Sequence, residues 1–313
     1  MNKKRFFASL LTLVLLLSLA TPAFALFERQ RLDPAHPFDN SEFCTVGDYT
    51  IHYRTFPASP SKGQIFMIHG FALSSYCFVE LAEELVAAGY TCVLADLPNF
   101  GYSTRETADT EKLPREDLMY AVMESISTDP WTVAGHSMGG YVALALGTKY
   151  PAAVKNLLLY GTAGNDGAAG AAKAVMENDL LLRSMGAILE TAGKSKMLIR
   201  LLYIVACNSI SYALHYDVDK ITDPYYIKGT GEGALRNFNM LPPTDYAAVR
   251  QMPPILFVNG DRDFVITDGA RKNLRAALPQ GSEDYVVKGG GHMCIETHAA
   301  EVAAVTTAFM ERV

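Results

Sequence analysis

Short apolar runs alternate with amphipathic segments along most of the chain. Residues 49–56 alternate apolar and polar side chains and are rich in β-forming residues, which predicts a strand. Six other short runs, most of them almost wholly apolar, predict buried strands at residues 64–68, 91–97, 131–136, 154–160, 254–259 and 283–287. Helical periodicity predicts helices at residues 76–88, 115–127, 138–150, 268–278 and 295–312. This alternation is typical of an α/β fold with a mainly parallel sheet flanked by helices on both faces.

One long stretch, residues 163–252, interrupts this alternation because it contains no convincing strand. Within it, residues 175–190 and 195–206 predict amphipathic or buried helices, and residues 222–233, rich in Gly and Tyr, predict a connector. We therefore expect a helical insertion, residues 163–252, that forms a cap or lid rather than a separate folding domain. The parts of the chain on either side of it are expected to form one core, residues 26–162 and 253–313.

The first 25 residues are typical of a secretory signal peptide. Basic residues at positions 3–5 precede an apolar run at residues 6–20, and Ala23 and Ala25 are the small residues that a signal peptidase reads. The run is shorter than the roughly 20 residues that span a bilayer, so we expect cleavage after Ala25 and a secreted or extracytoplasmic protein. The alternative is an uncleaved anchor that tethers the protein to a membrane. No later segment is long and apolar enough to span a membrane.

Composition narrows the classes of function. Half of the 313 residues are hydrophobic and the net charge is -6, so a sizeable core is expected and nothing indicates nucleic-acid binding, which favours a basic surface. The five cysteines are scattered without a Cys-x-x-Cys pair, the histidines are dispersed, and the H-E-x-x-H motif does not occur in the sequence. We therefore expect no metal site.

The candidate chemistry centres on Ser137, in the motif Gly135-x-Ser137-x-Gly139. The motif lies directly between the predicted strand at residues 131–136 and the predicted helix at residues 138–150. A sharp strand-to-helix turn of this kind holds a nucleophilic serine and needs small residues around it. The turn would place the serine hydroxyl at the carboxyl ends of the strands, where ligands bind in open α/β sheets.

A serine hydroxyl is a poor nucleophile until a base takes its proton, and a histidine base needs an acid to hold it. His292 follows the last predicted strand and three glycines that let its loop reach back toward Ser137. Asp263 follows the strand at residues 254–259 and is the favoured acid, and Asp166 is a weaker alternative. Asp261 is expected to order the turn or to pair with Arg262. The order serine, acid, histidine is the one expected for a triad on a strand-to-helix turn.

An acyl-transfer site also needs two donors for the negative oxygen of the tetrahedral intermediate. One candidate is the backbone N–H of Met138, at the start of the helix that follows Ser137. The other is the backbone N–H of Phe71, in the loop after the strand at residues 64–68. The Phe71 ring is also a candidate for the lining of an acyl pocket.

Five motifs, in this order and spacing, resemble the α/β-hydrolase superfamily, in particular its lipase, esterase and lysophospholipase-like branch with a helical cap. The resemblance covers nearly all of the chain from about residue 45 onward. It implies an eight-stranded, mainly parallel sheet and hydrolysis without a cofactor. Asn99 stands where the family more often has glycine. The motifs are His69-Gly70-Phe71, Asp96-Leu97-Pro98-Asn99-Phe100-Gly101-Tyr102-Ser103, Gly135-His136-Ser137-Met138-Gly139-Gly140, Gly260-Asp261-Arg262-Asp263 and Gly291-His292.

We therefore expect a secreted serine hydrolase that cleaves small-molecule carboxylic esters, acyl or aromatic, through an acyl-enzyme intermediate. An amide or peptide hydrolase, aminopeptidase-like, or an acyltransferase on the same triad is the alternative. A substrate amine would then need an acidic site in the helical insertion, for which Glu177, Asp179, Asp217 and Asp219 are candidates. A binding protein without activity is disfavoured, because such proteins typically lose a member of the triad.

Overall fold

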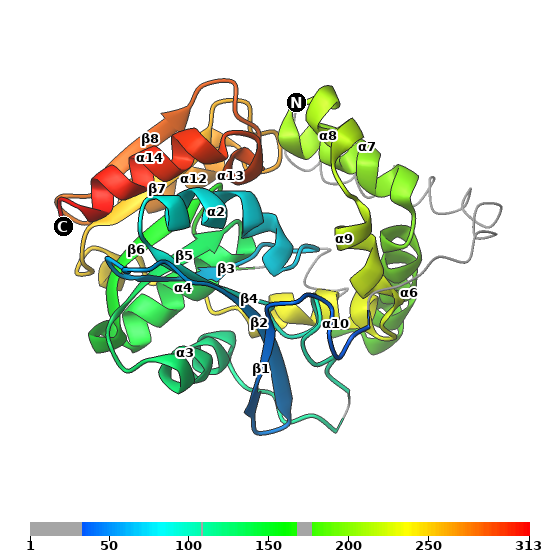
Figure 1. Ribbon diagram of the computed structural model, residues 1–313. Helices are drawn as coiled ribbons and strands as arrows, with labels where there is room; N and C mark the ends of the chain where they lie inside the picture. The colour runs from blue at the N-terminus through cyan, green and yellow to red at the C-terminus, as the bar shows by residue number, and fades with distance from the viewer. Residues whose placement is uncertain (1–32, 108, 168–176) are drawn as a thin grey trace.

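The computed structural model describes residues 33–107, 109–167 and 177–313. Its sheet has eight strands in the spatial order β1-β2-β4-β3-β5-β6-β7-β8 (Figure 1). The pairs β1–β2 and β2–β4 are antiparallel and the other pairs are parallel, which confirms the predicted mainly parallel sheet. The strands are β1 Ser41–Val46, β2 Tyr49–Phe56, β3 Gln64–Ile68, β4 Thr91–Ala95, β5 Trp131–His136, β6 Val154–Tyr160, β7 Ile255–Gly260 and β8 Glu283–Val287.

Helices cover both faces of the sheet, so the buried strands fill two separate cores. Successive side chains of a strand point to opposite faces: in β3, Phe66 and Ile68 pack in the core beneath α3 and α4, whereas Ile65 and Met67 pack in the core beneath α2 and α14. This double burial is the reason that the central strands read as continuous apolar runs. The flanking helices are α2 Val79–Ala87, α3 Arg115–Ile126, α4 Met138–Lys149, α12 Asp268–Arg275, α13 Cys294–Thr297 and α14 Ala299–Met310.

One strand and the last predicted helix differ from the prediction. Strand β1 was not among the predicted ranges, and its side chains are all exposed or only partly buried, so its sequence lacks an apolar pattern. The single helix predicted at residues 295–312 is two helices, α13 and α14. They are separated at His298, whose backbone is not helical, with φ −132° and ψ 35°.

Between β6 and β7 the described chain is helical, and Figure 1 shows α6 to α10, in green and yellow, gathered to one side of the sheet. The division into a core and a cap stays a prediction. The signal peptide expected at residues 1–25 lies outside the described residues, and in the described part of the chain no helix is long and apolar enough to cross a bilayer. The helices of this stretch are α6 Asp179–Gly193, α7 Lys196–Cys207, α8 Ile210–His215, α9 Asp219–Thr222, α10 Thr230–Asn237 and α11 Tyr246–Val249.

The connector expected at residues 222–233 is wrong, because helix α10 begins at Thr230. Its glycines serve close packing rather than a turn. A Cβ added at Gly231 would lie 1.9 Å from the backbone oxygen of Gly186 in α6, and one at Gly233 would lie 2.3 Å from Oδ1 of Asn99. Only glycine lets α10 approach both neighbours so closely, and this outweighs the low helix propensity of glycine.

A buried carboxyl group joins the helical stretch between β6 and β7 to α13, beside the sheet. Glu296 of α13 is 3% exposed and accepts hydrogen bonds from the hydroxyls of Tyr203, in α7, and Tyr216, after α8, the latter at 3.0 Å. Burial raises the pKa of Glu296 to about 8, although both hydrogen bonds oppose the shift. The carboxyl group is therefore largely protonated in the folded protein at neutral pH.

This raised pKa predicts that stability falls as the pH rises. The folded state holds the proton of Glu296 up to about pH 8, whereas the ordinary pKa of a glutamate is 4.5. The contribution of this protonation to the free energy of unfolding is therefore complete below pH 4.5 and lost above about pH 8. The slope from this one group is at most about 1.4 kcal/mol per pH unit. Glu296→Gln should remove that slope from the free energy of unfolding, measured by urea denaturation, whereas the exposed Glu311→Gln should keep it. Parallel pH dependence in the parent and Glu296→Gln would contradict the account.

Candidate active site

Ser137 occupies a strained turn between β5 and α4. Its φ of 52° and ψ of −119° are unusual for a residue with a side chain, and strain of this kind persists only where the surroundings enforce it. The flanking glycines allow the close packing that enforces this turn. A Cβ added to Gly135 would lie 2.5 Å from the backbone oxygen of Gly139, and a Cβ added to Gly139 would lie 2.1 Å from the backbone oxygen of Ile68. The side chain of Ser137 remains partly exposed while its neighbours are buried.

His292 lies in the loop after β8, where three strand ends meet. Its carbonyl oxygen accepts a hydrogen bond of 3.0 Å from Nε2 of His136, the last residue of β5, and the two imidazole centroids are 4.7 Å apart. Gly161, after β6, has a φ of +53°, and an added Cβ there would lie 3.2 Å from the same carbonyl oxygen. His136 therefore ties the strand that precedes Ser137 to the loop that carries His292.

Of the three acidic residues that follow β6 and β7, Asp263 contacts His292. Its Oδ2 lies 2.8 Å from His292 Nδ1 and its side chain is buried. Asp261 instead accepts a hydrogen bond of 2.7 Å from the backbone N–H of Gly289, and Asp166 accepts one of 2.7 Å from the hydroxyl of Tyr246. The last two acidic groups thus order neighbouring loops and do not bond to the histidine.

Asp263 is held as a carboxylate. Burial disfavours its charge, but the hydrogen bond and charge of His292, followed by the charge of Arg271, outweigh burial, so the pKa of Asp263 lies below its usual range. Oδ1 also accepts the backbone N–H groups of Val265 at 2.8 Å and Ile266 at 2.9 Å. An ionised carboxylate only accepts, so Nδ1 of His292 carries the proton and Nε2 presents its lone pair.

Two further histidines near Ser137, His69 and His136, are both buried. His69 donates from Nδ1 to Gly70 O at 2.7 Å and accepts the backbone N–H of Leu97 at 3.0 Å. Burial lowers the pKa of His69 and lowers that of His136 to about 3, so both are neutral near pH 7. They fix loops beside Ser137 rather than carry a charge.

The loop with the predicted oxyanion donor runs beside the serine. A Cβ added at Gly70 would lie 3.0 Å from Cβ of Ser137, so Phe71 follows at the edge of the turn. Met138 is the first residue of α4, and the first N–H groups of a helix have no acceptor within it. The ring of Phe71 lies 5.8 Å from that of Phe100 and 4.9 Å from that of Phe238, which belongs to the helical insertion.

Two residues near the site were given no role by the sequence analysis. Arg271 of α12 bonds to Asp263, and its position in the charged segment Asp268–Arg275 gave no signal of burial. Asn99, which replaces the more usual glycine, has a φ of 71°, a conformation that asparagine tolerates better than most residues. Two hydrogen bonds to Glu106 fix the side-chain amide of Asn99. Asn99 Nδ2 donates to Glu106 Oε2 at 2.7 Å, and Asn99 Oδ1 accepts the backbone N–H of Glu106 at 2.8 Å.

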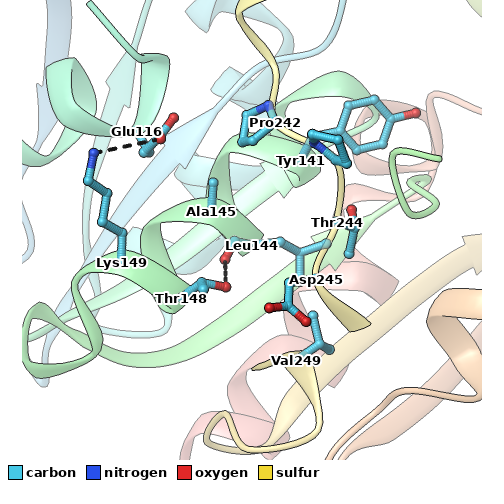
Figure 2. Close-up of a pocket in the computed structure, with 11 residues that line it drawn as sticks. Glu116, Tyr141, Leu144, Ala145, Thr148, Lys149, Pro242, Thr244, Asp245 and Val249 are labelled. Carbon is cyan, nitrogen blue, oxygen red and sulfur yellow. Dashed lines mark hydrogen bonds and ion pairs between the residues drawn. The ribbon is translucent and has the colours of Figure 1, made fainter. Parts of the chain in front are cut away.

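A pocket of about 220 Å³ lies elsewhere, between α3, α4 and the segment that leads into α11 (Figure 2). Glu116, Tyr141, Lys149 and Asp245 are among its lining residues, and none of the predicted site residues lines it. Within the residues that the structure describes, no group of three or more His, Cys, Asp or Glu side chains is arranged to hold a metal ion.

Comparison with known proteins agrees with this architecture. A family model described as the alpha/beta hydrolase family matches residues 65–305, and the chain therefore belongs to that family. An abhydrolase domain-containing protein of Caenorhabditis elegans is 33% identical over 131 residues, 39% of this chain and 28% of that protein. Lipase 3 of a Moraxella species is 35% identical over 102 residues, 32% of each chain. The chain thus spans less than a third of the length of these relatives.

Solved structures share the fold at low identity. The crystal structure of a membrane phospholipase A superposes with a TM-score of 0.67 at 20% identity and covers 98% of each chain. At this identity the match supports the fold alone. Together with the family match, it makes the protein an α/β hydrolase with lipase-like relatives.

The packing of the turn predicts a large effect of one methyl group. In Gly139→Ala the new Cβ would meet the backbone oxygen of Ile68, so we expect a destabilisation of about 2 to 3 kcal/mol. Gly63→Ala is the matched control, because its nearest neighbour would be Tyr90 at 3.8 Å, and should change stability by no more than about 0.5 kcal/mol. Urea denaturation measures both; equal midpoints for the two variants would contradict the packing argument.

Proposed function

We propose that the protein is a serine hydrolase of carboxylic esters in which Ser137 is the nucleophile, His292 the base and Asp263 the orienting acid. The observation that carries the proposal is the 2.8 Å hydrogen bond between His292 Nδ1 and the Asp263 carboxylate, in the loops beside the strained turn at Ser137. The alternative acid Asp166 and the neighbouring Asp261 both bond elsewhere, which supports the choice of Asp263.

The chemistry follows from the tautomer of His292. Its Nε2 lone pair takes the proton of the Ser137 hydroxyl as Oγ attacks the ester carbonyl carbon. The Asp263 carboxylate stabilises the imidazolium that forms. The tetrahedral intermediate collapses to an acyl-enzyme, and the leaving alcohol takes the proton from His292. A water molecule, activated by the same histidine, then releases the acid and restores the serine.

The negative oxygen of the intermediate needs donors that are already in place. We assign this role to the backbone N–H groups of Met138 and Phe71. Support comes from the position of Met138 at the start of α4 and from the close approach of Gly70 to Ser137. Because both donors are backbone groups, substitution of either side chain need not abolish the activity.

The proposed substrates are small esters with an acyl or aromatic group. We assign an apolar wall of the acyl site to the rings of Phe71 and Phe238, whose centroids are 4.9 Å apart. Phe71 directly follows Gly70, which approaches Ser137, and Phe238 belongs to the stretch between β6 and β7. The similarity of this chain to proteins named as lipases also supports esters rather than amides as the proposed substrates. The basic, apolar and small-residue pattern of residues 1–25 supports export from the cytoplasm as part of the proposal.

Replacing the nucleophile tests the proposal. Ser137→Ala removes the attacking oxygen, so kcat with a short-chain p-nitrophenyl ester should fall at least about 10⁴-fold. Ser125→Ala, on α3, serves as the control and should keep the parent rate. Parallel assays with aminoacyl anilides test the amide alternative. Full ester turnover in Ser137→Ala would contradict the assignment of the nucleophile. Faster turnover of anilides than of esters by the parent protein would instead indicate an amide hydrolase.

A second test separates the two neighbouring acids. Asp263→Asn should lower kcat by about 10⁴-fold, because a neutral amide neither fixes the tautomer of His292 nor stabilises its cation. Asp261→Asn should change kcat little, because an amide oxygen can still accept from Gly289 N–H. Circular dichroism checks that both variants are folded. The assignment of the acid is wrong if Asp261→Asn is the variant that loses activity.

A further inference from the structure

Arg271 bonds to the same carboxylate oxygen as His292. Its guanidinium Nη2 donates to Asp263 Oδ2, which also accepts from His292 Nδ1 at 2.8 Å. Because Oδ1 accepts two backbone N–H groups, each oxygen of the carboxylate has two donors. The Arg271 side chain comes from α12, a different element from the loops that carry Asp263 and His292.

The charged guanidinium of Arg271 is buried, so it needs a partner that balances its charge. Arg271 is only 2% exposed, and a buried charge is costly unless it is paired. Its Nε is buried without a hydrogen-bond partner in the described part of the chain, so the guanidinium is not satisfied by a wider network. Asp263 is its ion-pair partner. The contact with the acid is therefore what balances the charge of Arg271.

We propose that Arg271 is a positioning residue for the proposed ester hydrolysis: it fixes the Asp263 carboxylate and keeps it ionised, so that the reaction continues into mildly acidic conditions. This inference rests on the proposed function. Arg271 touches neither substrate nor reacting atoms, and acts through Asp263 on the orientation of His292.

The physical basis is a competition over the charge of Asp263. Burial favours the neutral acid, whereas His292 and Arg271 favour the carboxylate, and the carboxylate prevails. Without the cation, burial would meet less opposition and the acid would take up a proton at a higher pH. A protonated Asp263 no longer holds His292 with Nε2 free to act as the base, so activity at acidic pH would be lost first.

Neighbouring groups do not offer another source for this pH dependence. His136 of β5 faces His292, and burial lowers its pKa to about 3. Burial raises the pKa of Cys294, in α13, to about 12, and the charges of Asp263 and Arg271 have smaller, opposite effects on it. Asp268 of α12 is exposed, and its hydrogen bond with Arg275 lowers its pKa. None of these three neighbours therefore replaces the Asp263 carboxylate as the group through which Arg271 acts.

The test compares pH–rate profiles of kcat/KM for a short-chain p-nitrophenyl ester. Arg271→Gln keeps a donor to Asp263 but removes the charge, and its acidic limb should move upward by about one pH unit. Arg271→Lys keeps the charge, so its acidic limb should stay with the parent while kcat falls, because the planar fork of donors is lost. Lys272→Gln removes an exposed charge from the same helix and should match the parent.

The outcomes separate the role of Arg271 from the proposed function. An acidic limb of Arg271→Gln that coincides with the parent, or a loss of rate equal at every pH, overturns the inference and leaves ester hydrolysis standing. If Arg271→Gln does not fold, Arg271→Lys decides: a limb that moves upward contradicts the role of the charge, and an unmoved limb with lower kcat supports it. A folded parent that turns over no ester refutes the proposed function and this role with it.

Discussion

The hydrogen bond between His292 and Asp263 is the interaction on which the rest of the site depends. It joins the loops after β8 and β7 and fixes which imidazole nitrogen carries the proton. Because β5, β6, β7 and β8 are adjacent and parallel, their carboxyl ends lie along one edge of the sheet. The register of the sheet thus brings together a serine, a histidine and an acid that are far apart in the sequence.

Close backbone packing supplies the second constraint. Gly139 lets the turn at Ser137 sit against β3, and Gly135 lets β5 approach the start of α4. Gly260 lets the loop after β7 touch the loop that carries His292, since a Cβ there would lie 2.2 Å from Gly290 O. The helical insertion also contacts the histidine loop, through a 3.1 Å hydrogen bond from Met293 N–H to Ala206 O. The site is therefore held by main-chain contacts as well as by side chains.

Much of the fold could be predicted because its signals are local. The turn motif around Ser137 and the buried strands at residues 64–68 and 131–136 coincide with the structure, since double burial leaves an unbroken apolar run. Strand β1 was missed because an exposed edge strand carries no such run. Helix α10 was taken for a connector because the reason for Gly231 and Gly233 is a contact with α6 and Asn99, which no local pattern reveals.

In the candidate site, too, local motifs predicted some residues, whereas only tertiary contacts revealed others. Ser137, His292 and Asp263 could be proposed from motifs and their order, but the sequence left Asp166 as a weaker rival of Asp263, because both acids follow predicted strands. Their separation came only from tertiary contacts. Arg271 could not be found at all, since an arginine in a charged amphipathic helix looks solvated until its partner is known.

The central claim is that Ser137 is a nucleophile activated by the Asp263–His292 pair. The most direct measurement is mass spectrometry of peptides from the folded protein after reaction with a fluorophosphonate, which phosphonylates an activated serine and displaces fluoride. The account predicts one phosphonyl adduct, on the peptide that contains Ser137, and much slower labelling in His292→Ala. An adduct on another residue, or labelling of Ser137 at the same rate without His292, would contradict it.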